Sequence, residues 1–375
     1  MPADARDPRL LRLARTLIRY STKLQPGEKV LIELVDEGEP LARALIAEAY
    51  AAGAVPFLWV KDYSLLGALL TGASREQLAA IGAHEAAFME QMDAYVAIRG
   101  WRNPAELSEV PADRMTLYQK HWWEPVHGRV RVPRTKWCVL RYPTAAMAFS
   151  ANMSVPAFTD FYFNACLLDY ERLGAAMEAL ARRLEQADEV RITGPGTDLR
   201  FSVRGMPAVL CAGRRNIPDG EVFTAPVRDS VNGTVTFNVP SVYGGFTFEN
   251  VRLTFRDGRI VDGVASDSDR MFRILDTDEG SRYVGEFAIG VNPRILWPMK
   301  DTLFDEKIAG SFHLTPGSAY NEADNGNRSA IHWDLVCIQR PEWGGGRIYF
   351  DGELVREDGR FVTPDLEGLN PEHWE

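Results

Sequence analysis

The first half of the chain alternates between helix-like and strand-like patterns of apolar residues. Residues 8–20 place leucines and an isoleucine at helical spacing, and the run 29–35 (KVLIELV) is typical of a buried strand. Residues 39–52 again follow a helical pattern that ends at Gly53, and residues 55–60 form a second strand-like run. This alternation predicts a parallel sheet flanked by helices. No G-x-G-x-x-G sequence follows the first strand, so nothing supports a dinucleotide site there.

From about residue 187 the pattern changes to short strand-like runs separated by turn dipeptides. The last long helical pattern covers residues 173–186. After it, three dipeptides lie between strand-like segments, as tight hairpins require: Asn232-Gly233, Asp257-Gly258 and Asp351-Gly352. The second half is therefore expected to be rich in antiparallel strands.

Length and composition agree with two packed globular domains. The chain has 375 residues, of which 46% are hydrophobic and 25% charged, and a typical domain has roughly 150 residues. We expect an α/β fold with an N-terminal α/β domain containing a parallel sheet (1–187) and a C-terminal α+β domain (188–375).

Charge, cysteine spacing and hydropathy limit the partners. The net charge is −10, so the basic surface that nucleic-acid binding needs is not expected. The four cysteines form no C-x-x-C pair, which fits a reducing compartment. The N-terminal residues carry charges where a signal peptide needs an apolar core, and the longest apolar stretch, residues 41–60, is interrupted by charges and a proline. A cytoplasmic protein that binds neither membrane nor nucleic acid is expected.

Two ionisable residues occupy one face of a strand-like segment near the C-terminus. In residues 329–339 (SAIHWDLVCIQ), His332 and Asp334 are two positions apart and so point to the same side. Both faces of the segment are mainly apolar, which predicts a central, buried strand. An unpartnered buried carboxylate is costly, so either a hydrogen-bonded His–Asp pair or a metal ion is expected.

Glu249 is a second acidic residue in an apolar register. Alternation places it in phase with Val251, Leu253 and Phe255, on the inward face of a strand that turns at Asp257-Gly258. A carboxylate there needs a cation or a group of donors, unless it reaches solvent at the end of the strand.

Two further residues complete a set of possible metal ligands in the second half of the chain. Glu286 precedes an apolar run, and His313 is flanked by small residues; taken singly, a surface glutamate and a core histidine are the ordinary interpretations. As a set of oxygen and nitrogen donors, these residues suit Zn, Co or Mn. They are enough for two ions about 3.5–4 Å apart that share a carboxylate. The set is Glu249, Glu286, His313, His332 and Asp334.

Four separated motifs resemble the aminopeptidase T and aminopeptidase S family of metallopeptidases. They are residues 220–255 (GEVFTAP…FENVRLTF), 276–290 (DTDEGSRYVGEFAIG), 311–320 (SFHLTPGSAY) and 327–335 (NRSAIHWDL). The resemblance extends over essentially the whole chain. It implies a C-terminal metal-binding domain with two divalent ions (zinc, cobalt or magnesium) and carries the family's ligands over onto the five residues above. It also implies a tyrosine near the metals, which is Tyr320, and a homodimer that encloses its active sites and so favours short peptides.

The expected reaction is removal of the N-terminal residue from a short peptide by a metal-activated water molecule. Glu286 or the nearby Glu221 would move protons, and Tyr320 would donate a hydrogen bond to the oxyanion.

Two other functions are compatible with parts of the ligand set. His313, His332 and Asp334 alone match the two-histidine, one-carboxylate arrangement of mononuclear non-haem iron enzymes, including ring-cleaving dioxygenases that resemble this family. Such a site would not use Glu249 or Glu286 as ligands, and this favours the peptidase. A binding protein with a structural metal is the third possibility.

Overall fold

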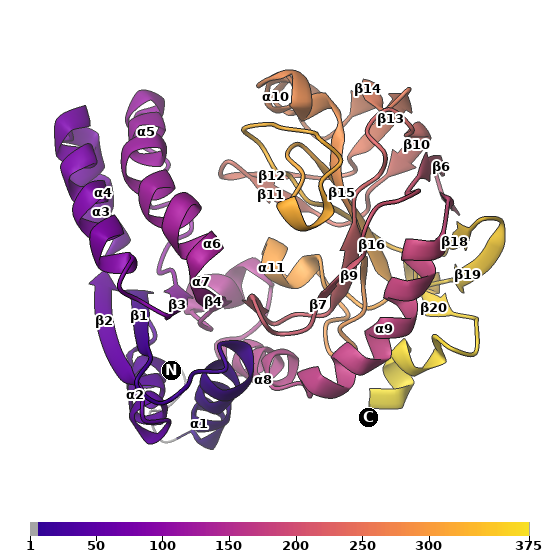
Figure 1. Cartoon of the computed structure of the whole chain (residues 1–375). Helices are drawn as coiled ribbons and strands as arrows, with labels where there is room; N and C mark the ends of the chain where they lie inside the picture. Colours follow the sequence, from indigo (N-terminus) through magenta and orange to yellow (C-terminus); the bar gives the residue numbers. More distant parts are fainter. Residues whose placement is uncertain (1–6, 375) are drawn as a thin grey trace. The chain divides into compact units, whose positions relative to one another are not determined.

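The computed structural model describes residues 7–374 and divides into two compact units (Figure 1). The first unit runs to Leu167 and also contains Gly213–Ile217, and the second contains Leu168–Ala212 and the chain from Pro218 onward. Helix α9 (Tyr170–Gln186) belongs to the second unit because it contacts strands β7 and β9 there. The division therefore falls before this helix, and not at residue 187 where the sequence pattern changes.

The first unit is built on the predicted parallel sheet, which is confirmed. Its strand order is β2-β1-β3-β4-β8, and every neighbouring pair is parallel. The strands are β1 (Lys29–Asp36), β2 (Val55–Lys61), β3 (Ala94–Gly100), β4 (Lys136–Arg141) and β8 (Asn216–Ile217).

Helices cover this sheet because successive residues of its strands alternate between two apolar faces. On one face Leu31 and Tyr95 pack with Leu78 and Met89 of α4 and with Trp122. The helices of the unit are α1 (Pro8–Arg15), α2 (Glu39–Ala51), α3 (Tyr63–Gly72), α4 (Arg75–Met89), α5 (Ala112–Tyr118), α6 (Val132–Arg134), α7 (Ala145–Ser150) and α8 (Val155–Cys166), with π-helical segments Thr16–Ser21 and Gln119–Arg131.

A charged side chain, that of Glu33, lies deep inside the first sheet. Glu33 in the middle of β1 is 1% exposed, and its carboxylate is 2.8 Å from Arg99 Nη1 and 3.2 Å from Lys61 Nζ. Burial by itself would raise the pKa of Glu33, but the two cations lower it to about 2. The carboxylate is thus compensated within the unit.

The second unit consists of antiparallel sheets. The larger has the order β14-β13-β10-β6-β5-β18-β19-β20, the smaller β17-β16-β15-β9-β7, and β11 and β12 form a separate hairpin. Phe287 of β15 contacts Phe201 of β6, with ring centroids 5.0 Å apart, so the two sheets pack on each other through one face of β15. The other face of the smaller sheet does not take part in this packing.

The second unit contains the following strands, short helices and turns. The larger sheet contains β5 (Glu189–Gly194), β6 (Thr197–Ser202), β10 (Asn232–Thr236), β13 (Arg252–Arg256), β14 (Arg259–Val264), β18 (Arg347–Phe350), β19 (Glu353–Glu357) and β20 (Arg360–Phe361). The smaller sheet and the hairpin contain β7 (Val209–Cys211), β9 (Glu221–Thr224), β11 (Ser241–Tyr243), β12 (Phe246–Phe248), β15 (Val284–Gly290), β16 (Ser311–Pro316) and β17 (Leu335–Ile338). Short helices α10 (Ser268–Leu275) and α11 (Thr302–Asp305) and 3₁₀ turns Glu279–Arg282, Asn321–Ala323, Pro341–Trp343, Glu367–Leu369 and Pro371–Trp374 connect them.

Two of the three predicted hairpin turns are confirmed. Asp257-Gly258 joins β13 to β14, and Asp351-Gly352 joins β18 to β19, with positive φ at all four residues (48°, 78°, 49° and 86°) as a type I′ turn requires. The third prediction is wrong, because Asn232-Gly233 begins β10 and pairs with β6 and β13.

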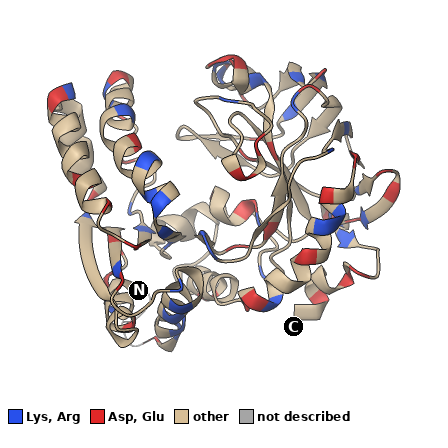
Figure 2. Ribbon diagram, viewed as in Figure 1, with Lys and Arg blue, Asp and Glu red and all other residues tan. Residues whose placement is uncertain are grey.

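Neither unit concentrates charge of one sign along its ribbon. Lys and Arg residues are distributed among Asp and Glu residues in both units (Figure 2). Between residues 7 and 374, no helix has the length and apolar character needed to span a bilayer.

Candidate metal centre

Three of the candidate residues lie on one face of the smaller sheet. Strand β15 pairs with β16 so that Ala288 is opposite His313, and with β9 so that Gly290 is opposite Glu221. Because side chains alternate with a period of two, Glu286, His313 and Glu221 point to the same side. This is the face opposite Phe287, which points toward the larger sheet. The strand register therefore brings together residues that are far apart in the sequence.

Residues 306–311 pack closely over Gly290 on this face. Ala288 and Gly290 are the next two residues on the same face of β15 after Glu286. A Cβ atom at Gly290 would lie 2.5 Å from the backbone oxygen of Ile308 and 2.7 Å from Ser311 Oγ, closer than van der Waals contact allows. The absence of a side chain at Gly290 therefore allows the segment that carries Glu306 and Lys307 to approach β15.

His332 and Asp334 approach from the segment that precedes β17. The predicted juxtaposition is present, since His332 Nε2 is 3.4 Å from Asp334 Oδ1. The predicted central strand is wrong: β17 begins only at Leu335 and lies at the edge of its sheet. His332 instead forms an isolated bridge with Gly317. Thr315 on β16 donates a 2.6 Å hydrogen bond to Asp334 Oδ1 and holds that carboxylate.

Glu286 connects two groups of potential ligands. Its Oε2 atom is 3.2 Å from His332 Nε2, and its Oε1 atom is 3.5 Å from His313 Nε2. Glu286, His332 and Asp334 form one group whose donor atoms all lie within 4.8 Å of one another. The carboxylate of Glu286 thus reaches the imidazoles of both histidines.

A second group lies beside His313 and contains a residue that the sequence did not suggest. Glu221, Glu306 and His313 again offer donor atoms within 4.8 Å of one another. Glu306, which follows α11, is 2.7 Å from Lys307 Nζ, and Lys307 also contacts Glu221 and lies 3.7 Å from Asp219. Lys307 is 1% exposed. Its ammonium group is therefore enclosed by three carboxylates.

The residues present fit a metal ion. Glu221 Oε2 and His313 Nδ1 are buried and have no hydrogen-bond partner among the residues that the structure describes. They are 3.9 Å apart. Buried polar atoms without a partner are rare, and a cation between them would satisfy both.

The charges of the site favour cations. Burial would lower the pKa of both imidazoles, but the carboxylates raise the pKa of His313 to about 9 and that of His332 to about 10. Burial would likewise raise the pKa of Glu286, yet its hydrogen bonds to His313 and His332 hold that pKa well below its ordinary value. Burial raises the pKa of Glu221 to about 8 despite the charge of Lys307. A pocket that binds protons this strongly is a site where a divalent ion can replace them.

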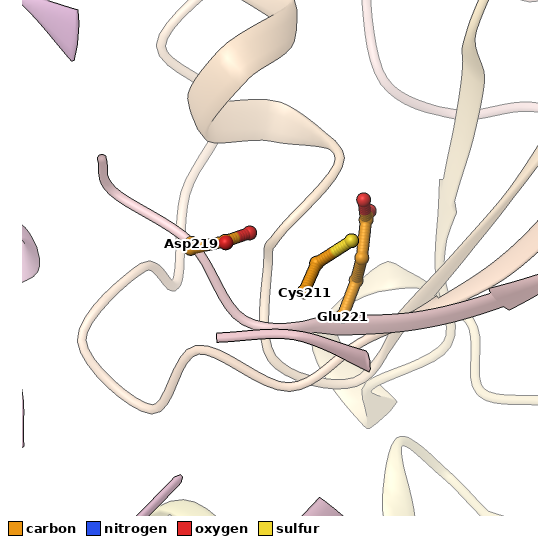
Figure 3. A group of neighbouring side chains, drawn as sticks. All are labelled: Cys211, Asp219 and Glu221. Carbon is orange, nitrogen blue, oxygen red and sulfur yellow. The ribbon is translucent and has the colours of Figure 1, made fainter. Parts of the chain in front are cut away.

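Cys211 at the end of β7, Asp219 just before β9 and Glu221 at the start of β9 form a third group (Figure 3). The scattered positions of the cysteines gave no sign of this contact. Burial and the nearby carboxylates raise the pKa of Cys211 well above its ordinary value, so the thiol keeps its proton. The ammonium of Lys307 already compensates Asp219 and Glu221. A thiol that keeps its proton is a poor metal ligand, so this group is not a favourable metal site.

Glu249 is not brought into either histidine-containing group. The expectation that it faces inward on a strand is wrong, because β12 ends at Phe248 and β13 begins only at Arg252. Glu249 is exposed in the interval between them, where Asn250 adopts a positive φ of 53° and breaks the alternation. Glu221, which the sequence suggested only for proton transfer, stands beside His313 instead.

Tyr320 lies next to His332. Their ring centroids are 4.6 Å apart, and the tyrosine ring also meets Phe223 of β9 at 5.8 Å. Tyr320 is 47% exposed, so a ligand can reach it. Partial burial and the charges of Glu286 and Asp334 hold the pKa of Tyr320 above its ordinary value, so its hydroxyl can donate a hydrogen bond.

The one-iron arrangement is not formed as a single group. His313 belongs with Glu221 and Glu306, whereas His332 and Asp334 belong with Glu286, among the described residues. This grouping does not favour the dioxygenase alternative.

Comparison with known proteins identifies the family of the chain. The family model described as thermophilic metalloprotease (M29) matches residues 6–361. The chain is 29% identical to aminopeptidase T of Thermus thermophilus, over 96% of this chain and 100% of the relative, and 27% identical to aminopeptidase 2 of Geobacillus stearothermophilus, over 92% and 94%. The solved structure of wild-type AmpT from Thermus thermophilus superposes with a TM-score of 0.80 and 25% identity, covering 95% of this chain and 99% of that one. The two-domain α/β fold is thus confirmed, and the chain belongs to the thermophilic metalloprotease (M29) family.

Proposed function

We propose that this protein is a metal-dependent aminopeptidase that removes the N-terminal residue from short peptides. The observation that carries the proposal is the pair of adjacent ligand groups joined by Glu286. Relatives over nearly the whole chain are named aminopeptidases, which supports the same activity.

Two divalent ions, zinc, cobalt or magnesium, are proposed for these groups. Glu286, His332 and Asp334 would hold one, and Glu221 and His313, through its Nδ1 atom, the other, while Glu286 contacts the Nε2 atom of His313. Carboxylate and imidazole donors without thiolate suit such ions. When bound, they supply the polarisation of a carbonyl group and the activation of a water molecule that peptide hydrolysis needs.

The surrounding residues fix the orientation of the ligands. His332 Nδ1 is 2.9 Å from the backbone oxygen of Ser318 and donates to it, which leaves Nε2 free to bind a cation. Thr315 orients Asp334 in the same manner. Lys307 holds Glu221 and Glu306 in place through its ammonium group.

We assign proton transfer to Glu306. The sequence suggested Glu286 or Glu221 for this role, but both contact imidazole nitrogens and are better used as ligands. Glu306 belongs to the same group as His313. Its carboxylate would accept a proton from the attacking water and deliver it to the leaving amine.

Tyr320→Phe tests the proposed oxyanion contact. The hydroxyl would donate a hydrogen bond to the developing oxyanion, so its removal is expected to lower kcat by about 10²-fold with little change in KM. Steady-state kinetics on a dipeptide amide measures both constants. Tyr349→Phe is the matched control, because Tyr349 is a partly buried tyrosine on β18 of the larger sheet, opposite Arg191 of β5. Equal losses in the two variants would contradict the assignment.

Metal removal and reloading test the function itself. Protein treated with a chelator is expected to release no amino acid from unblocked di- and tripeptides, and to recover activity with about two equivalents of zinc or cobalt. An N-acetylated peptide serves as the control substrate, since an aminopeptidase needs a free amine. Turnover that survives complete metal removal, or equal cleavage of the blocked peptide, would refute the proposal.

We also propose that the protein is a homodimer and that it is located in the cytoplasm. The resemblance of the four motifs to the aminopeptidase T and S family supports the dimer. The four cysteines are free thiols in the structure, as a reducing compartment favours.

A further inference from the structure

A small polar cavity with a volume of about 40 Å³ lies inside the first unit. The polar residues of its lining that matter below are Glu33, Lys61, Tyr63, Arg99, Tyr118 and His127. One water molecule needs at least roughly 10–15 Å³ of such space, so the cavity has room for about three water molecules or for one small ion. All of the lining residues belong to the first unit, so the cavity is separate from the metal centre of the second unit.

The cavity lies at the face of the parallel sheet that α4 covers. Val35 of β1 is opposite both Lys61 of β2 and Arg99 of β3, and Glu33 is two positions before Val35. Because side chains alternate with a period of two, Glu33, Lys61 and Arg99 point to the same face. The other polar residues of the lining come from α3, α5 and the π-helical segment Gln119–Arg131. The cavity is therefore enclosed between this face, near the carboxyl ends of β2 and β3, and the helical segments.

An imidazole N–H without a partner lines the cavity. Arg131 Nε donates a 3.1 Å hydrogen bond to His127 Nδ1. Burial lowers the pKa of His127 to about 3, so the ring is neutral and its one proton lies on Nε2. His127 is 5% exposed. Its Nε2 atom has no hydrogen-bond partner among the described residues, yet it is not fully enclosed by protein atoms, so it can be reached from the cavity.

Further hydrogen-bond donors line the same space. The hydroxyl groups of Tyr63 and Tyr118 have no partner in the described part of the chain, and neither of them is fully enclosed. Lys61 Nζ lies 3.2 Å from Glu33 and 3.1 Å from Glu85, which leaves one of its three N–H bonds free. A ligand that accepts hydrogen bonds would satisfy these groups.

The charges around the cavity favour an anion over water. The carboxylates of Glu33 and Glu85 compensate Lys61 and Arg99, which lie within 3.2 Å of them. Arg131 is 8% exposed, and among residues 7–374 no carboxylate lies within ion-pair distance of it. One positive charge is thus left without a counter-ion, and burying an unpaired charge is costly. Water molecules in the cavity would satisfy the donors but not this charge.

We propose that the cavity binds one small monovalent anion, either chloride or formate, held by Lys61, the Nε2–H group of His127 and the Tyr118 hydroxyl. Hydrogen bonds to an anion are roughly twice as strong as those between neutral groups. His127 connects the anion to Arg131, whose guanidinium donates to the other nitrogen of the same ring. The volume excludes anions with long organic chains.

Thermal unfolding of the full-length protein at constant ionic strength tests this. Sodium gluconate, whose anion is too large for the cavity, is replaced stepwise by sodium chloride or by sodium formate. We expect at least one of the small anions to raise the Tm saturably, because it binds only the folded protein. The anion that saturates at the lower concentration is the ligand. In Tyr118→Phe the midpoint concentration is expected to be about tenfold higher, since one hydrogen bond to a charged group is lost.

Two further variants sharpen the test. His127→Phe keeps a ring in place but removes the Nε2–H group, and about a tenfold higher midpoint is again expected; should this variant not fold, Tyr118→Phe decides alone. Tyr50→Phe is the matched control, because Tyr50 is an exposed tyrosine on α2 of the same unit, and its midpoint should equal that of the unaltered protein.

Three results would overturn the proposal. The first is a Tm that saturates with neither small anion, which would mean that only water fills the cavity. The second is a midpoint that Tyr118→Phe leaves unchanged, as expected for an anion bound at the metal centre. The third is an equal shift in Tyr118→Phe and Tyr50→Phe. None of these measurements depends on peptidase activity.

Discussion

Glu286→Gln is expected to abolish peptide hydrolysis. The substitution keeps the shape of the side chain on β15 but removes the charge that reaches the imidazoles of both His313 and His332. We expect kcat/KM to fall by about 10³-fold or more, the scale of losing a preorganised charged group in an active site. Because Glu286 would hold one ion and contacts the histidine that would hold the other, metal content should fall from about two ions per chain to about one or less. Steady-state kinetics and elemental analysis of the same preparation measure both effects.

Glu249→Gln is the informative comparison for this variant. Glu249 is an acidic residue of the same unit that the sequence suggested as a ligand and that the structure places at the surface. It should retain activity within about twofold and a full complement of metal, as surface substitutions generally do. The site assignment would fail if Glu249→Gln lost metal, or if Glu286→Gln kept both ions and a third of the activity.

Local sequence spacing was a reliable guide where one segment carries two candidate ligands. His332 and Asp334 are adjacent in space because their side chains are two positions apart in extended backbone, although the regular strand begins only at Leu335. The parallel sheet of the first unit could also be predicted, since the apolar runs and helical periods of residues 8–60 are local signals.

The other candidate ligands come together through hydrogen bonding between strands that are far apart in the sequence. No local pattern in the sequence indicates which of these strands are neighbours. Glu221 and Glu286 are 65 positions apart, and only the pairing of β9 with β15 places both near His313. The prediction for Glu249 is wrong because it extends the inward–outward alternation of a strand through residues 249–251. The strand is interrupted there, and Asn250 has a positive φ. Period-two arguments fail wherever an unseen break shifts the phase.

The sequence around Glu306 and Lys307 contains an indication of their buried ion pair. They lie in the run LFDEKIAG, where adjacent charges interrupt apolar residues. Charged residues are seldom buried unless they are paired, so such an interruption indicates either a surface turn or an internal ion pair. The structure shows the second, with the Lys307 side chain 1% exposed between Asp219, Glu221 and Glu306.

Lys307→Met is expected to destabilise the second unit strongly. Methionine fills a similar volume, but Asp219, Glu221 and Glu306 lose the cation that they surround and must either stay charged in the interior or take up protons; breaking a buried ion pair in this way costs roughly 3–5 kcal/mol. For a unit of this size we expect the Tm to fall on the order of 10 °C, which thermal unfolding followed by circular dichroism measures. The double variant Lys307→Met with Glu306→Gln removes one of the uncompensated charges and should recover part of the loss, while Lys300→Met, a substitution at a partly exposed lysine of the same unit, should change the Tm by only a few degrees. If Lys307→Met melted at the unaltered temperature, the three carboxylates would be neutral in the folded protein, and the ammonium could not be what holds Glu221 and Glu306 beside His313.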